Sequence, residues 1–255
     1  MKRDCQIESD WKLLCSDEFD GETLDKNKWN RQIEKAVRFN EEWQRYTDND
    51  DNTYIENKQL VIQAIHNSKA HGHNQYSSAR LNTTRKFNFK CGKIVARMKL
   101  PFARGIWPAF WMLGKNIDEN GGDTLWSFCG EIDILELYGT EDNGVVEANL
   151  RYADRKGKHE QIGAKPYKLK EGAFADAFHI FELEWNEKQI IWLIDVDPHA
   201  SLDIMAKEFS EFHREFFLLL NVAVGRTYVG RPYNTSIFSQ FMYVNWIRVY
   251  QKNSV

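Results

Sequence analysis

Short segments in which apolar residues alternate with polar ones, or run without a break, recur along the whole chain. Residues 93–100 alternate and place Ile94, Ala96 and Met98 on one side, as expected of a strand with one buried face. Residues 107–113 are apolar on both faces, which is typical of a central strand. The same patterns predict further strands at 60–64, 216–224 and 243–251, and a hairpin made of 179–185 and 189–196.

Only one stretch, residues 204–214, shows apolar residues at spacings of three to four, so one helix is predicted there. Many strands with almost no helix predict an all-β fold, an antiparallel β-sandwich. Internal repeats, low-complexity tracts and linker-like segments are absent from the sequence. Residues 1–255 are therefore predicted to form a single domain.

Three acidic residues, Glu131, Asp133 and Glu136, fall within the segment GEIDILELYG. A helix would scatter them around its axis. On a regular strand Glu131 and Asp133 would share a face, but Glu136 would point among apolar residues, and burying an unpaired carboxylate is unfavourable. One extra residue near 134–135, a β-bulge, would return Glu136 to the same face and turn Leu137 to the core.

Two glutamates on one strand face can perform retaining glycoside hydrolysis, in which one carboxyl attacks the sugar and the other protonates the leaving oxygen. Asp133 between them would favour keeping one acid protonated near neutral pH. Trp107 and Trp111 would share one strand face about 13 Å apart, which suits stacking on successive sugar rings. The alternative is that the acids mark an ordinary surface strand and that these tryptophans, with Trp126, belong to the core.

Composition limits the classes of molecule that the protein is expected to bind. The chain has 34 basic and 37 acidic residues, a net charge of −3, so nucleic acid and anionic membranes are not expected as partners. Apolar runs fall well short of the roughly 20 residues of a spanning helix. Aromatic residues make up 14%, which suits both strands and sugar-binding clefts. The four cysteines are widely spaced, so a zinc site is not expected and at most one disulfide is.

The sequence resembles glycoside hydrolase family 16, and most closely its laminarinase (endo-β-1,3-glucanase) branch. The strongest matches are GIWPAFWMLG and GEIDILE. Weaker matches cover nearly the whole chain in the family's order: SDEFDG, LDKNKWN, NEEWQRYT, YSSARLNT, FHIFELEW, LLLNVAVG and YVNWIRVYQ.

The resemblance implies a β-jelly roll of two antiparallel sheets with a concave substrate cleft. It implies Glu131 as nucleophile, Glu136 as acid/base and Asp133 as an assisting carboxylate. Family positions that contact sugar are matched by Arg80, Trp107, Trp111, Trp126 and, less closely, Asn40. It further implies that catalysis needs no cofactor and that a monomer cleaves β-1,3 linkages in laminarin-type or mixed-linkage β-glucans.

Two positions depart from the family pattern. Arg151 stands where laminarinases usually carry a histidine, so the subsite for the leaving sugar is expected to differ. Many members hold a structural calcium through the backbone near a residue such as Glu18 and through an aspartate, whose position here is Asn245. An amide is a weaker ligand for a hard cation, so calcium remains only a possible structural ligand.

Two other functions stay open. A galactan hydrolase of the agarase or porphyranase type shares the bulged motif, and the Arg151 guanidinium could pair with a sulfated sugar. A non-catalytic β-glucan-binding protein is the other, although such relatives typically lack the glutamates. Because its expected substrate lies outside the cell, the protein is expected to be exported. The first residues lack the apolar core of a signal peptide, so the native signal would then be absent from this sequence. A cytoplasmic location stays open.

Overall fold

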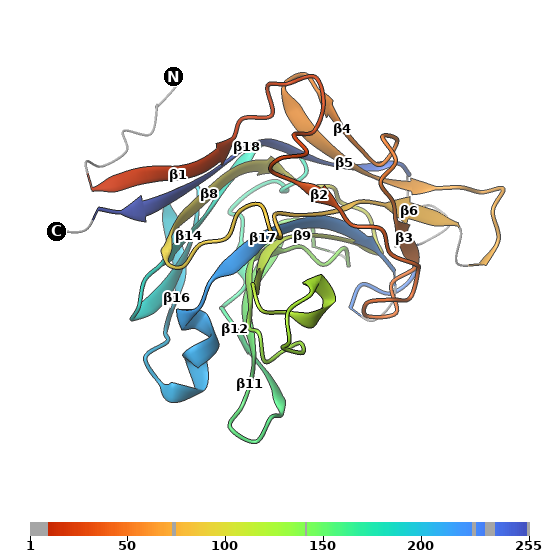
Figure 1. Cartoon of the computed structure of the whole chain (residues 1–255). Coiled ribbons are helices and arrows are strands. Elements are labelled where there is room, and N and C mark those ends of the chain that lie inside the picture. Colours follow the sequence, from red (N-terminus) through yellow and green to blue (C-terminus); the bar gives the residue numbers. More distant parts are fainter. Residues whose placement is uncertain (1–9, 73–74, 141, 226–227, 233–237, 254–255) are drawn as a thin grey trace.

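Two β-sheets packed face to face make up the computed structural model, which describes residues 10–72, 75–140, 142–225, 228–232 and 238–253 (Figure 1). Neighbouring strands are antiparallel except for β3 and β6, which pair in parallel. Sheet I contains, in spatial order, β16 (Asp197–Asp203), β15 (Gln189–Ile194), β14 (His179–Trp185), β8 (Gly92–Lys99), β18 (Gln240–Lys252), β5 (Gln59–His66), β6 (Tyr76–Ser78) and β3 (Gln44–Tyr46), with β1 (Trp11–Asp17) on β18 and β4 (Thr53–Glu56) on β5.

Sheet II carries the residues expected to do chemistry. Its order is β12 (His159–Gly163), β11 (Val145–Ala153), β10 (Glu131–Glu136), β9 (Ile106–Gly114), β17 (Phe216–Val224), β7 (Arg80–Asn82) and β2 (Asn30–Arg31), with β13 (Tyr167–Lys168) on β11. The predicted sandwich of two sheets is confirmed. The β9 segment lies in the middle of sheet II, as its two apolar faces predict.

The core lies between the two sheets, and the alternation of each strand decides which side chains enter it. Ile94, Ala96 and Met98 of β8 are fully buried there, as predicted. On β17 the even-numbered residues join this core, whereas Asn221 turns to the opposite face of sheet II. That outer face of sheet II is therefore available for a cleft.

The predicted strands are all present, with bounds that differ by a few residues. The second strand of the hairpin, predicted to reach residue 196, ends at Ile194, because Asp195 and Val196 turn the chain with positive φ angles of 50° and 69°. A further strand, β16, follows this turn and pairs with β15. Its sequence DPHASLD has little apolar alternation, so the pattern did not predict it.

The predicted helix at 204–214 is wrong in type and length. The structure has a short 3₁₀ segment, η3 (Lys207–His213), interrupted at Phe209, where φ is −103° and ψ is 21°. Phe209 and Phe212 are buried, and the Trp185 indole N–H donates to the Phe212 carbonyl oxygen at 3.0 Å. Packing of these aromatic rings against Tyr152 of β11 and Phe216 of β17, both in sheet II, therefore decides the backbone here. A second short 3₁₀ segment, η2 (Asp118–Asn120), follows β9.

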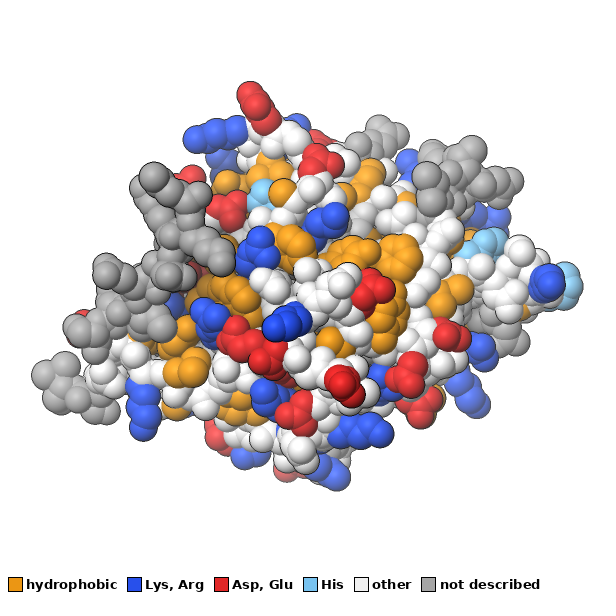
Figure 2. Space-filling model, turned by 90° about the horizontal axis from the view of Figure 1, so that it is seen from above, with side chains coloured by type: hydrophobic (Ala, Val, Ile, Leu, Met, Phe, Trp, Pro, Cys, Tyr) orange, Lys and Arg blue, Asp and Glu red, His pale blue; other side chains and the backbone are white. Residues whose placement is uncertain are grey.

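The face in Figure 2 shows acidic and basic side chains interspersed, with apolar side chains between them. This mixture agrees with the net charge of −3. Across the described residues, no helix is both long and apolar enough to cross a membrane.

Cys15, Cys91 and Cys129 are free thiols, and Cys5 lies outside the described residues. Burial raises the pKa of Cys129 to about 12, and the Glu131 charge adds to this effect. Cys129 is therefore a packed thiol rather than a reactive one.

Candidate active site

A β-bulge on β10 brings the three acidic residues to one face of sheet II. Asp133 lies opposite Trp111 of β9, but the next paired residue, Leu135, lies opposite Phe110, so β10 has one extra residue at this point. Glu131, Asp133 and Glu136 all line the same cavity as a result. Leu137 lies in the core between the sheets, as the predicted bulge requires.

The chain enters β10 through a tight turn at Gly130, whose φ is +80°. A Cβ atom there would lie 3.0 Å from the Phe216 ring, closer than side chains normally pack. Glycine has no Cβ, so it adopts this left-handed backbone without strain and leaves room for the Phe216 ring. The turn places Trp126, on the preceding loop, beside Glu131.

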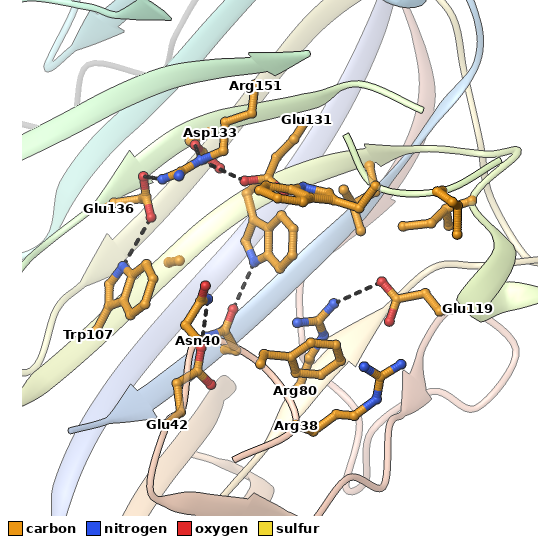
Figure 3. A pocket seen from close by; sticks show the side chains of 18 of the residues that line it. Arg38, Asn40, Glu42, Arg80, Trp107, Glu119, Glu131, Asp133, Glu136 and Arg151 are labelled. Atoms are coloured by element: carbon orange, nitrogen blue, oxygen red, sulfur yellow. Dashed lines mark hydrogen bonds and ion pairs between the residues drawn. The ribbon is translucent and has the colours of Figure 1, made fainter. Parts of the chain in front are cut away.

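Arg151 of β11 contacts all three acids (Figure 3). Its Nε lies 2.9 Å from Glu131 Oε1 and 3.3 Å from Asp133 Oδ2, and its Nη2 lies 3.1 Å from Glu136 Oε2. The four residues are buried, with exposed fractions between 2% and 8%. Both glutamates thus contact the same guanidinium, and this shared contact holds their carboxyl groups close together. Retaining glycoside hydrolysis uses a carboxyl spacing of about 5–5.5 Å.

Two indole N–H groups hold the glutamates in place. Trp126 Nε1 donates to Glu131 Oε2 at 2.7 Å, and Trp107 Nε1 donates to Glu136 Oε1 at 3.1 Å. Asn149 Nδ2 donates to Glu136 Oε2 at 2.7 Å. These tryptophans do not belong only to the core, because they orient acids in a solvent-accessible cavity.

Burial and mutual repulsion keep a proton in this cluster at neutral pH. Burial raises the pKa of Glu131 to about 7, while the Arg151 charge opposes this rise and the Glu136 charge adds to it. Burial also raises the pKa of Asp133 well above its usual range, with the charges of Glu136 and Glu131 acting in the same direction. The acids contact one guanidinium and titrate together. The cluster can therefore hold an ionised carboxyl and a protonated one at once.

The cavity extends from the acids along the outer face of sheet II and has a volume of about 410 Å³. Trp107 and Trp111 line it from one face of β9, as the sequence predicts. The Arg80 guanidinium lies 4.7 Å from the Trp111 ring centroid and 3.7 Å from Glu119 Oε1. Trp126, 46% exposed, also lines the cavity. Its walls offer aromatic faces and polar side chains, the combination that binds sugars.

Asn40 lines the same cavity and donates to Glu42 Oε1 at 3.2 Å. Glu42, which was not predicted as a site residue, is 5% exposed and also accepts hydrogen bonds from Gln44 at 2.6 Å and Tyr46 at 3.2 Å. Burial raises the pKa of Glu42, and these three hydrogen bonds oppose the rise. The alternate spacing of Glu42, Gln44 and Tyr46 was the available signal, because it places three polar groups on one strand face.

Asn221 was also missed, because it sits in the apolar run of β17. Its Oδ1 accepts from the Trp111 indole at 2.7 Å, and its Nδ2 donates to the Tyr46 hydroxyl at 3.1 Å. A single amide in such a run was the signal, since a buried polar group needs partners. The two hydrogen bonds of Asn221 thus hold the Trp111 ring in place where it lines the cavity.

The side chains of both residues considered for calcium contact arginines. The Glu18 carboxylate pairs with the Arg248 guanidinium at 2.9 and 2.8 Å. Asn245 Oδ1 accepts from Arg97 Nη1 at 2.9 Å, which places a fixed positive charge beside the oxygen that would bind the metal. Among the described residues, no group of three or more His, Cys, Asp or Glu side chains is placed to hold a metal ion.

Comparison with known proteins gives consistent matches. The sequence model of glycosyl hydrolases family 16 matches residues 36–235. The laminarinase catalytic domain from Thermotoga maritima MSB8 superposes with a TM-score of 0.82 at 40% identity, covering 96% of this chain and 100% of that one. Glucan endo-1,3-beta-glucosidase A1 from Niallia circulans is 32% identical over 263 residues, which cover 94% of this chain but 38% of that protein.

A third relative, the glucan endo-1,3-beta-glucosidase of Cryptopygus antarcticus, is 33% identical over 240 residues, which cover 89% of this chain and 85% of the relative. The chain thus spans well under half of the Niallia circulans protein and most of the Cryptopygus antarcticus one.

Proposed function

The chain belongs to glycosyl hydrolases family 16, and on that premise we propose that it is a retaining endo-β-1,3-glucanase. Its substrate would be laminarin-type or mixed-linkage β-glucan. One observation carries the proposal: Glu131, Asp133 and Glu136 lie on one face of a bulged strand, beside two indole donors, in a cavity lined by tryptophans.

The geometry supports a double displacement. The Glu131 carboxylate attacks the anomeric carbon while Glu136 donates its proton to the departing glycosidic oxygen, leaving a glycosyl ester on Glu131. Glu136, now ionised, then takes a proton from water, which attacks the same carbon and releases Glu131. Two successive inversions retain the configuration of the sugar. Asp133, in contact with the same guanidinium, disfavours the fully ionised cluster and so helps keep the first proton available.

The choice of β-1,3-glucan draws on the named relatives, and the cavity supports a glucan chain. Arg80 and the exposed faces of Trp111 and Trp126 line one continuous surface. Such aromatic faces bind the apolar sides of neutral sugar rings.

The galactan alternative loses the feature that favoured it. A sulfated sugar needs a cation free to receive it, but the Arg151 guanidinium is engaged by Glu131, Asp133, Glu136 and Gln161. The binding-protein alternative would leave both glutamates, with their paired indole donors, without a use. We therefore keep the hydrolase as the single proposal.

A reducing-end assay on laminarin, barley mixed-linkage glucan and agarose tests it. Wild-type protein is expected to release reducing ends from laminarin, and Glu131→Gln to lose at least about a thousandfold of that rate. The matched control is Glu182→Gln on β14, because Glu182 is as buried as Glu131, at 8% exposed, but lies in sheet I. Activity on agarose alone, or equal activity in Glu131→Gln, would refute the proposal.

We also propose that the protein acts as a monomer outside the cytoplasm. The support is chemical: a β-glucan polymer does not cross a cell membrane, so an enzyme that cleaves within it must meet it outside.

A further inference from the structure

Arg151 is the cation at the centre of the candidate active site, and its place there follows from strand register. Arg151 of β11 lies directly opposite Glu131 of β10, and two residues away Asn149 lies opposite Asp133. The side chain therefore points along the row of acids and contacts all three. Within the part of the chain that the structure describes, Arg151 is the one cation within ion-pair distance of these carboxyls.

The guanidinium is fixed from its far side by a closed ring of hydrogen bonds. Arg151 Nη1 donates to Gln161 Oε1 at 3.1 Å, and Gln161 Nε2 donates to Asn149 Oδ1 at 2.9 Å. Asn149 Nδ2 and Arg151 Nη2 both donate to Glu136 Oε2, at 2.7 and 3.1 Å. Gln161 comes from β12, next to β11 in sheet II. The position of the charge is therefore set by neighbouring strands as well as by the acids.

We propose that Arg151 is a positioning residue that sets the pH range of the reaction, by holding Glu131 ionised while one proton stays within the acid cluster. The inference rests on the proposed hydrolase function. One guanidinium compensates only part of the negative charge of three carboxylates. The repulsion that remains between them favours keeping one carboxyl protonated. Without that charge, Glu131 and Asp133 would hold their protons to higher pH, because the guanidinium opposes the rise in pKa of both carboxyls.

Among the residues that the structure describes, other charged or titratable groups face the cluster, and none of them replaces Arg151. Arg80 influences Glu131 from a greater distance, and it is paired with Glu119 at 3.7 Å. Burial lowers the pKa of His159 of β12, and the Arg151 charge lowers it further, so this imidazole is a weaker source of positive charge than an ordinary histidine. Further described groups near the cluster are Glu147 of β11 and Tyr138 after β10, both with pKa values raised by burial, together with the Tyr228 ring.

The first test is the pH profile of kcat/KM on laminarin for wild type, Arg151→Met and Arg151→Lys. Arg151→Met removes the charge and keeps the aliphatic stem, so both limbs of the profile are expected to move up by about one pH unit or more. Arg151→Lys keeps the charge but loses the planar guanidinium that contacts several partners at once. The limbs of its pH profile are therefore expected to stay near those of wild type while kcat falls. Limbs of Arg151→Met that coincide with those of wild type would overturn the inference.

A second readout needs no substrate and keeps the test independent of the proposed function. Removing a compensating charge raises the carboxyl pKa values of the folded state, and a raised pKa makes stability decline as pH rises through it. Arg151→Met is therefore expected to lose more Tm at about pH 9 than at about pH 5. A merely structural role would lower Tm equally at both, and that result would overturn the inference.

If Arg151→Met does not fold, the same comparison is made between Asp133→Asn and Asp133→Asn/Arg151→Met. The double variant removes an acid together with the cation and so buries less unpaired charge. Its Tm loss relative to Asp133→Asn should again grow with pH, and a pH-independent difference would refute the role of Arg151. A wild type that hydrolyses no β-glucan would refute only the proposed function.

Discussion

Replacing Glu131 with glutamine is expected to stabilise the folded chain at alkaline pH while it removes catalysis. Glu131 is 8% exposed, and burial raises its pKa from the ordinary 4.5 to about 7, with Arg151 opposing this rise and Glu136 adding to it. A carboxyl whose pKa is raised by folding contributes stability that is fully present below its unfolded pKa. That stability is lost as pH rises through the folded pKa, because the unfolded chain releases the proton more readily.

The magnitude follows from the two pKa values. At about 1.4 kcal/mol for each pH unit between 4.5 and about 7, ionisation of Glu131 removes about 3 kcal/mol from the free energy of unfolding. Glutamine does not ionise and escapes this loss. For a chain of this size, about 3 kcal/mol corresponds to about 6–12 °C in Tm. The value is an upper bound, because Asp133 and Glu136 share the proton of the cluster.

Thermal unfolding at about pH 5 and about pH 9 measures the effect. The Tm of Glu131→Gln minus that of wild type should be larger at about pH 9 by several degrees. Glu22→Gln, which changes an exposed glutamate in the same way, is the control and should show equal differences at both pH values. A Glu131→Gln difference that is unchanged, or smaller, at the higher pH would refute the argument that burial of this carboxyl opposes its ionisation.

Three further outcomes are expected. Trp126→Phe keeps an aromatic face but removes the N–H that donates to Glu131 at 2.7 Å, so kcat/KM on laminarin should fall about 10- to 100-fold; an unchanged value would show that this hydrogen bond is not used. Cys129, whose pKa is raised to about 12 by burial, stays protonated at pH values well below 12, so mass spectrometry after iodoacetamide treatment of the native protein at about pH 8 should find it unmodified; rapid labelling would contradict the burial. Chelation by EDTA should change Tm by less than about 1 °C, since Asn245 already accepts from Arg97; a fall of several degrees would reveal a metal site that these contacts do not accommodate.

Local pattern was sufficient for most strands and for the acid cluster, because strand parity is a property of consecutive residues. Regular alternation would turn Glu136 to the face opposite Glu131 and Asp133, and this conflict predicted the bulge. The structure has the bulge between Asp133 and Leu135. The helix prediction at 204–214 failed because apolar spacing does not distinguish an α-helix from short 3₁₀ turns held by tertiary packing.

Contacts between distant segments were the part that sequence did not reveal. Arg151 was expected to alter the subsite for the leaving sugar, and it lines the cavity, yet it forms ion pairs with three acids and a hydrogen bond with Gln161. Those contacts depend on the register of β10, β11 and β12, which pair across loops whose geometry no local pattern specifies. Glu42 has a local signal in its alternation with Gln44 and Tyr46, but that pattern does not show that Glu42 faces a cavity built by other strands.

The bulge that aims the acids needs support from the other sheet. An extra residue disrupts the ladder, so backbone groups there need other partners. The Asp133 carbonyl oxygen has one: it accepts from the indole of Trp192, on β15 of sheet I, at 2.9 Å. Trp192 is 2% exposed, so this bond lies within the core between the sheets. One face of the bulge thus holds repelling carboxyls around Arg151, while its other face is fixed by a buried donor. The geometry of the acid cluster is consequently tied to the packing of the whole sandwich rather than to sheet II alone.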